Sequence, residues 1–220
     1  MFKWLFERVR VLYLCRKYGI ENYTINKDNS IDVQGDLYLR DYRFEKLPIK
    51  FNIISGTFDC SHNRLTSFEN FPKQVGRLCA SDNKIESLVG LPLVVKSHFD
   101  IRPFINLSGN NIITFEGCSN IYNFKTNNFS DGNINGITLS SNPISKVWSY
   151  ILSGRKTGHN HLFTNEELNG LVDMINEYDF IRGDEIILDR FNEFLADVCR
   201  KGHTLHKHQF RIFKSYKIIK

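Results

Sequence analysis

The chain has 220 residues, of which 41% are apolar and 24% charged, and its formal net charge is +5 at pH 7. This composition is ordinary for a folded globular chain and excludes wholesale disorder. No run of about 18 uninterrupted apolar residues occurs, so no membrane-spanning helix is expected, and the charges within the first 15 residues make them a poor secretory signal.

The charge is unevenly distributed along the chain. Residues 1–20 carry +4 and residues 200–220 carry +7, which leaves −6 for the residues between them. Basic ends can mark contact with nucleic acid or a membrane, although solvated faces of terminal elements are the simpler interpretation. The five cysteines include no Cys-x-x-Cys pair, which favours reduced thiols used as small apolar residues. We therefore expect a cytoplasmic protein.

Residues 1–29 are predicted to form a helical cap followed by a polar lead-in loop. Apolar residues recur in this segment with the spacing of one helix face. They are Phe2, Leu5, Phe6, Val9, Leu12 and Tyr13. A basic helix of this kind can lie on a membrane surface, but covering the end of a repeat stack is the use that we favour. We therefore expect this face to be buried and no membrane to be a partner.

Residues 30–151 carry an internal repeat of about six turns. Each copy follows the pattern apolar-x-apolar-x-x-Asn-x-apolar-x-x-apolar, and Tyr42 replaces the asparagine in the first copy. The key asparagines, which we expect to form a structural ladder, are Asn63, Asn83, Asn110, Asn127 and Asn142. A buried asparagine can both donate to and accept from the open backbone groups of a bend, which would be costly if left unpaired.

Three turns share a second signature, an apolar residue followed by proline. It occurs at Leu47-Pro48, Phe71-Pro72 and Leu91-Pro92. Proline fixes φ near −65° and favours extended backbone. The return path of each turn is therefore predicted to be an extended, unpaired segment with few helices.

The segments FDCSHNRLTSFENFPKQV (58–75) and LCASDNKIESLVGLPLVV (78–95) resemble the repeats of leucine-rich repeat proteins. The lead-in over residues 18–51 and the first asparagine turn are similar to uncharacterised leucine-rich repeat proteins of tailed bacteriophages, and the Leu-Pro return is similar to that of short bacterial repeats. The resemblance covers about residues 30–150. It implies an α+β repeat protein, a leucine-rich repeat solenoid with a parallel concave sheet that binds proteins, and no catalytic residues to carry over.

Residues 152–163 read as a linker, and residues 164–220 as a C-terminal helical element with a basic tail. Thr164 begins a capping box before one helix, and Asp184 is predicted to cap a second helix that stops at Gly202. The tail, residues 203–220, has the pattern of a strand or a short helix with one apolar face. These helices are too short for a core of their own and should pack on the last repeats.

Chemistry-bearing residues do not assemble into a catalytic motif. Five histidines are of the type that ligates metals, but they belong to a polar loop and tail without a tight four-ligand pattern, so no metal or cofactor is expected. They are His159, His161, His203, His206 and His208. Cys199 is expected to be a core thiol rather than a nucleophile. The chain is therefore predicted not to be an enzyme.

A binding role is expected for the exposed side of the repeat strands. Residues two, four and six positions before each asparagine should point onto the concave face, because strand side chains alternate. Large side chains there are of the kind that anchor interfaces. The candidate partner-binding residues are Tyr38, Arg40, Asp59, Arg77, Phe104, Asn106, Ile121, Asn123 and Lys125.

Two functions remain open from the sequence. The first is a solenoid, encoded by a phage, that binds a host or viral protein, for example to inhibit a defence or to redirect a cellular factor. The second is a nucleic-acid-associated protein that uses its basic C-terminal tail. The sequence indicates neither the partner nor the oligomeric state.

Overall fold

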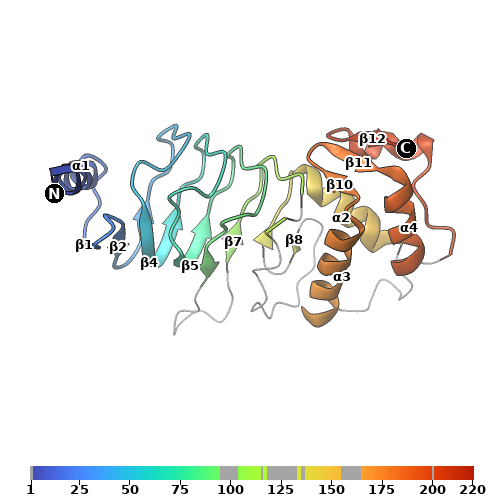
Figure 1. Ribbon diagram of the computed structural model, residues 1–220, viewed down its shortest axis with the longest axis horizontal. Coiled ribbons are helices and arrows are strands. Elements are labelled where there is room, and N and C mark those ends of the chain that lie inside the picture. Colours follow the sequence, from blue (N-terminus) through green and yellow to red (C-terminus); the bar gives the residue numbers. More distant parts are fainter. Residues whose placement is uncertain are drawn as a thin grey trace.

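The computed structural model describes residues 2–94, 104–114, 116–117, 133–134, 137–154, 165–199 and 201–220. In these residues it has mixed α/β content with one mostly parallel sheet. Helix α1 spans Phe2–Lys17 at one end (Figure 1). The sheet strands are β1 (Tyr23–Ile25), β2 (Ile31–Val33), β3 (Leu37–Tyr38), β4 (Phe51–Asp59), β5 (Gln74–Cys79), β6 (Leu93–Val94), β7 (Ile105–Asn106), β8 (Asn133–Ile134) and β9 (Ile137–Thr138).

The C-terminal elements lie at the opposite end of the molecule from α1 (Figure 1). They are α2 (Pro143–Ser153), α3 (Asn165–Tyr178), β10 (Ile181–Arg182), β11 (Glu185–Ile187), α4 (Leu188–Val198), the 3₁₀ helix η2 (Lys207–Phe213) and β12 (Lys217–Ile219). One cluster of buried apolar side chains runs from α1 to these elements.

Successive turns of the chain are stacked in register. Leu37 of β3 is level with Phe58 of β4, Leu78 of β5, Ile105 of β7 and Ile137 of β9, all in parallel. The first four of these side chains are buried, and their strand neighbours point outward, as the two-residue period of a strand requires. We call this row of turns, from β2 to β9, the stack.

The return paths of the three turns with a proline are also paired, contrary to the unpaired segments predicted from these prolines. Ile54 in β4 is level with Val75 in β5, which is level with Val94 in β6. Pro48, Pro72 and Pro92 each precede these paired residues rather than occupying a donor position in the ladder. Proline lacks a backbone N–H donor only at its own position, so the residues after it can pair with the neighbouring turn.

The asparagine side chains bridge neighbouring turns. Asn83 accepts a hydrogen bond from the Leu65 backbone N–H (2.9 Å) and donates to the carbonyls of Cys60 (3.1 Å) and Ala80 (3.2 Å). Asn63, Asn110 and Asn142 make the equivalent bonds. Each side chain thus satisfies backbone groups of its own bend and of the turn before. Asn127 lies outside the described residues.

In the turns that the structure describes, the residue before the asparagine position has a left-handed backbone. The φ values are +65° at Asp41, +54° at His62, +54° at Asp82 and +68° at Gly109. At Gly109 the space is also restricted, because a Cβ there would lie 2.4 Å from the Asp82 carboxylate. The backbone at this turn favours glycine and the Asp82 side chain would have to shift to accept a Cβ, whereas the other turns tolerate the strain of a side chain.

The face of α1 that packs on the stack is not the predicted one. Val11 and Cys15 are buried, and Tyr18, directly after the helix, contacts the rings of Tyr42 and Phe44 edge-on, each with centroids 5.2 Å apart. The predicted face is open to solvent. Its described members are Leu5, Phe6, Val9, Leu12 and Tyr13. The helix is apolar on two opposite sides, so periodicity alone did not decide which side is buried.

The last repeat ends earlier than predicted. After Asn142 the chain enters α2, whose first residue is Pro143, a residue well suited to begin a helix. Ile144, Val147 and Trp148 are buried. The predicted solenoid segment therefore includes the start of a helix, and the predicted linker includes its end, while residues 155–163 lie outside the described residues.

The C-terminal element contains a small sheet that was not predicted. Strands β10 and β11 form an antiparallel hairpin, and β12 pairs with β11 in parallel. Asp184 lies in the hairpin turn beside Gly183, which has φ +57°, so its predicted role as a helix cap is wrong. Helix α4 instead begins at Leu188 directly after β11. Thr164, the predicted cap of the preceding helix, lies outside the described residues.

Candidate protein-binding face

The exposed side of the stacked strands is a continuous face. We call the outward residues of segments 36–40, 57–61, 77–81 and 104–108 the strand face. Tyr38, Asp59, Cys79 and Asn106 are level with one another on adjacent strands and form its middle column. Tyr38 is exposed, and the next three are half-buried. The face thus presents one side chain of each turn at a regular strand spacing.

Two side chains of the middle column, those of Asp59 and Asn106, are fixed by local hydrogen bonds. The Oδ1 of Asp59 accepts from the backbone N–H and the hydroxyl of Ser61, and the Oδ1 of Asn106 accepts from the same groups of Ser108. These side chains are therefore held close to the backbone. The centre of the strand face is a low, polar floor on which a partner can approach the backbone closely.

Two large side chains stand beside this floor in contact with each other. The Arg77 guanidinium carbon lies 4.8 Å from the centroid of the Phe104 ring, on the neighbouring turn. Arg77 is exposed and Phe104 is half-buried. A cation held over an aromatic face is already ordered before a partner arrives, which reduces the entropy lost on binding.

The first turn contributes an ordered aromatic residue. The Tyr38 hydroxyl donates to Asp36 Oδ2 (3.1 Å), while Asp36 Oδ1 accepts from the Thr57 backbone N–H (2.6 Å). This hydrogen bond to the Asp36 carboxylate raises the pKa of Tyr38. Arg40, also exposed, pairs with Asp41 (3.1 Å). Tyr38 is therefore positioned by its carboxylate neighbour.

The structure brings most of the predicted binding residues onto this one face. Tyr38, Arg40, Asp59, Arg77, Phe104 and Asn106 all lie on it. The other predicted members lie outside the described residues. They are Ile121, Asn123 and Lys125.

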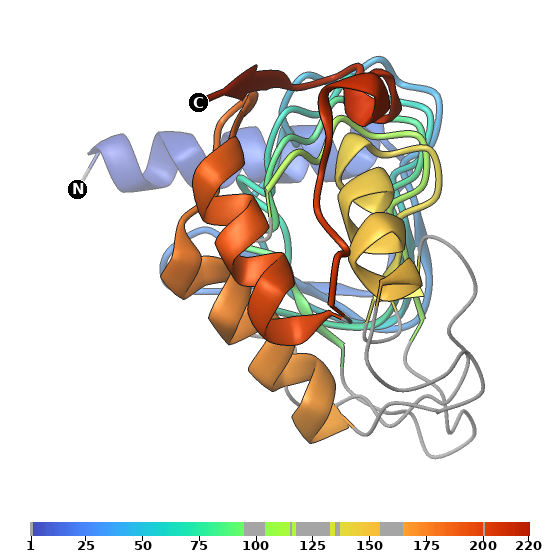
Figure 2. The same ribbon diagram turned by 90° about the vertical axis from the view of Figure 1, so that its right-hand side faces the viewer.

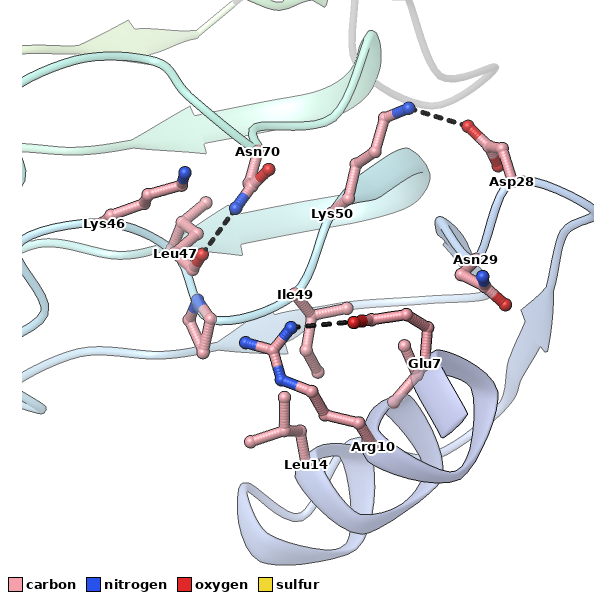
Figure 3. A pocket seen from close by; sticks show the side chains of 12 residues that line it. Glu7, Arg10, Leu14, Asp28, Asn29, Lys46, Leu47, Ile49, Lys50 and Asn70 are labelled. Atoms are coloured by element: carbon pink, nitrogen blue, oxygen red, sulfur yellow. Dashed lines mark hydrogen bonds and ion pairs between the residues drawn. The ribbon is translucent and has the colours of Figure 1, made fainter. Parts of the chain in front are cut away.

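A cleft that sequence reasoning missed lies between α1 and the return side of the stack (Figure 3). It has a volume of about 520 Å³. Its cations have acidic partners, because Arg10 contacts Glu7 at 3.2 Å and Lys50 contacts Asp28 at 2.7 Å. The Lys50 ammonium holds the pKa of Asp28 well below its usual range. In both of these pairs the cation is already neutralised by a carboxylate, so neither pair offers a free charge to a small ionic ligand.

The potentially reactive side chains are engaged in the structure. Burial raises the pKa of the Cys60 thiol well above its ordinary value. Cys199 is buried with its Sγ 3.5 Å from the Ile151 carbonyl, and the His203 ring is 3.1 Å from the Tyr150 carbonyl. Within the described part of the chain, no three His, Cys, Asp or Glu side chains gather as metal ligands. His159 and His161 lie outside it.

The comparisons with known proteins give no further identification. No family model, curated protein or solved structure matches the chain. Across the described residues, no helix has both the length and the apolar content needed to cross a bilayer.

Proposed function

We propose that the chain is a non-catalytic leucine-rich repeat solenoid that binds another protein through its strand face. We further propose that it is a phage product that engages a host protein in the host cytoplasm. Three features support this proposal: the parallel stack, the asparagine bonds between its turns, and the resemblance of residues 18–51 and the first asparagine turn to leucine-rich repeat proteins of phages. Stacked repeats present extended surfaces that are commonly used for binding proteins.

The contact between Arg77 and Phe104 is the observation that carries the binding proposal. Binding energy in protein interfaces concentrates in a few Arg and aromatic residues surrounded by weaker contacts. Here Arg77 and Phe104 are held together beside a floor of short polar side chains. Tyr38 adds an exposed aromatic residue on the first turn. This combination resembles the anchor-and-surround arrangement of interfaces.

Association with nucleic acid through the C-terminal tail is the alternative. Lys207, Arg211 and Lys214 are all exposed along and just after η2. Lys217 in β12 pairs with Asp184 (3.1 Å). Several exposed cations close together are an electrostatic footprint that suits phosphates.

A capture experiment separates the two functions. The tagged chain is used to isolate partners from bacterial lysate, which are identified by mass spectrometry, and affinity is then measured with the purified partner. We expect Arg77→Glu with Phe104→Ala to weaken binding by more than about 2 kcal/mol without changing the thermal melt. The matched pair Lys214→Glu with Lys217→Glu should leave binding unchanged.

Salt dependence provides a second readout. Binding anchored by apolar contacts should weaken little between low and moderate salt, whereas phosphate binding by several Lys and Arg side chains falls by orders of magnitude. The alternative function would replace the proposed one if the Lys214 and Lys217 variant lost binding, the Arg77 and Phe104 variant kept it, and binding depended steeply on salt.

A further inference from the structure

Helix α1 leaves an apolar stripe exposed on the side facing away from the stack. Phe6 and Tyr13 are 69% and 63% exposed, and Leu5, Val9 and Leu12 are each about half exposed or more. At 100° per residue these five side chains fall on one side of the helix, opposite the buried Val11 and Cys15. We call these five residues the α1 stripe.

The α1 stripe is accessible to a flat surface. Figures 1 and 2 show α1 lying across one end of the molecule, with its N-terminal part projecting past the strands. The inner face of the helix is fixed by Val11 and Cys15, and the Trp4 indole donates to the Lys27 carbonyl (3.3 Å). The helix can therefore present its outer face without leaving the stack.

Cations border the α1 stripe. On the helical wheel Arg8 and Arg10 lie about 100° to either side of its centre, and Arg16 and Lys17 stand at its C-terminal end. The helix has no acidic residue in its first turn, and Glu7 is paired with Arg10. The stripe is therefore an apolar strip with a net positive border.

We propose that the α1 stripe binds the surface of an anionic lipid bilayer. Exposed aromatic and aliphatic side chains can enter the boundary between headgroups and acyl chains, while the bordering cations meet anionic headgroups. A second copy of the chain is a poorer occupant, because it would place one strongly cationic helix against another. This role concerns a different surface from the strand face and does not depend on the proposed function.

The expectation that no membrane is a partner depended on this apolar face being buried against the first repeat. The structure buries the opposite face instead. Membrane-surface contact, which was the less favoured use of the helix, is therefore the use that fits its exposed side. The helix lies on the surface in this proposal and does not cross the bilayer.

Vesicle flotation with the purified full chain tests the proposal. The probes are phosphatidylcholine vesicles with and without phosphatidylglycerol. We expect binding to the anionic vesicles and little binding to the neutral ones. Phe6→Gln with Leu12→Gln should weaken binding at least tenfold, and Arg16→Gln with Lys17→Gln should also weaken it. The melting temperatures should stay near that of the unchanged chain, because all four side chains are exposed.

Two control pairs make the result specific. Val89→Gln with Leu93→Gln removes exposed apolar side chains from the stack, and Arg211→Gln with Lys214→Gln removes cations from the tail. Neither should change vesicle binding. The proposal is wrong if the chain does not bind anionic vesicles or if the Phe6 and Leu12 variant binds them as the unchanged chain does. It is also wrong if the Arg211 and Lys214 variant alone loses binding. If the unchanged chain self-associates without binding vesicles, and only the Phe6 and Leu12 variant loses this self-association, the α1 stripe binds a second copy of the chain instead.

Discussion

Replacing Asn83 by alanine tests how the stack is held together. The Asn83 side chain is 7% exposed and contributes one acceptor and two donors to buried backbone groups. Its loss leaves the Leu65 N–H without that acceptor, which costs about 1–3 kcal/mol for a buried donor. The carbonyls of Cys60 and Ala80 each keep another asparagine donor, so their losses add about 0.5 kcal/mol each.

We therefore expect Asn83→Ala to lower the free energy of unfolding by about 2–4 kcal/mol. With a urea dependence of about 3 kcal/mol/M for a chain of this size, the unfolding midpoint should fall by about 1 M. The assay is equilibrium urea unfolding followed by far-ultraviolet circular dichroism. Lys84→Ala, at the exposed neighbouring position, is the control. Equal midpoints for the two variants would refute the role assigned to the asparagine.

Four further predictions concern other parts of the fold. Gly109→Ala should destabilise the chain by about 1 kcal/mol more than Gly183→Ala in urea unfolding, because both have positive φ but only the first has a close neighbour; equal losses would contradict this. Tyr216→Phe removes the hydrogen bond that the buried Tyr216 hydroxyl donates to the Ile113 carbonyl (2.8 Å), and it should lower the free energy of unfolding by about 1–2 kcal/mol at pH 7. Burial raises the pKa of Tyr216 and of the Cys60 thiol, so these groups ionise at a lower pH in the unfolded chain than in the folded one. The free energy of unfolding should therefore fall as the pH rises above about 9. The fall should be less steep in Tyr216→Phe, and an unchanged slope would count against burial of this hydroxyl. Cys60 should resist a thiol reagent in the native chain at pH 8 and react after denaturation; rapid native labelling would show that the stack opens.

The spacing of the repeats was sufficient to predict which residues face inward. Leu37, Phe58, Leu78 and Ile105 are buried and level, and the asparagine side chains bond to the bends. The strand period acts within one turn, and each asparagine lies at the bend whose own carbonyl it satisfies, although its other hydrogen bonds reach the turn before. The positions of Tyr38, Arg77 and Phe104 on the strand face follow from the same rules.

The interfaces between elements could not be predicted in this way. Helix α1 has two apolar sides, and only contact with the first turn selects Val11 and Cys15 over Leu5 and Phe6. Ile144 and Val147 fit the repeat pattern equally well as helix residues, so the start of α2 was missed. The contact of Arg77 with Phe104 joins residues on two turns and has no signal in either turn alone.

Hydrogen–deuterium exchange of the chain with and without its captured protein partner tests the proposed binding face most directly. Partner binding should slow exchange in peptides that cover residues 36–40, 57–61, 77–81 and 104–108, because their exposed strand groups become covered. Peptides from residues 201–220 and from α1 should exchange as in the free chain. Protection confined to residues 201–220, with the strand peptides unchanged, would contradict binding through the strand face.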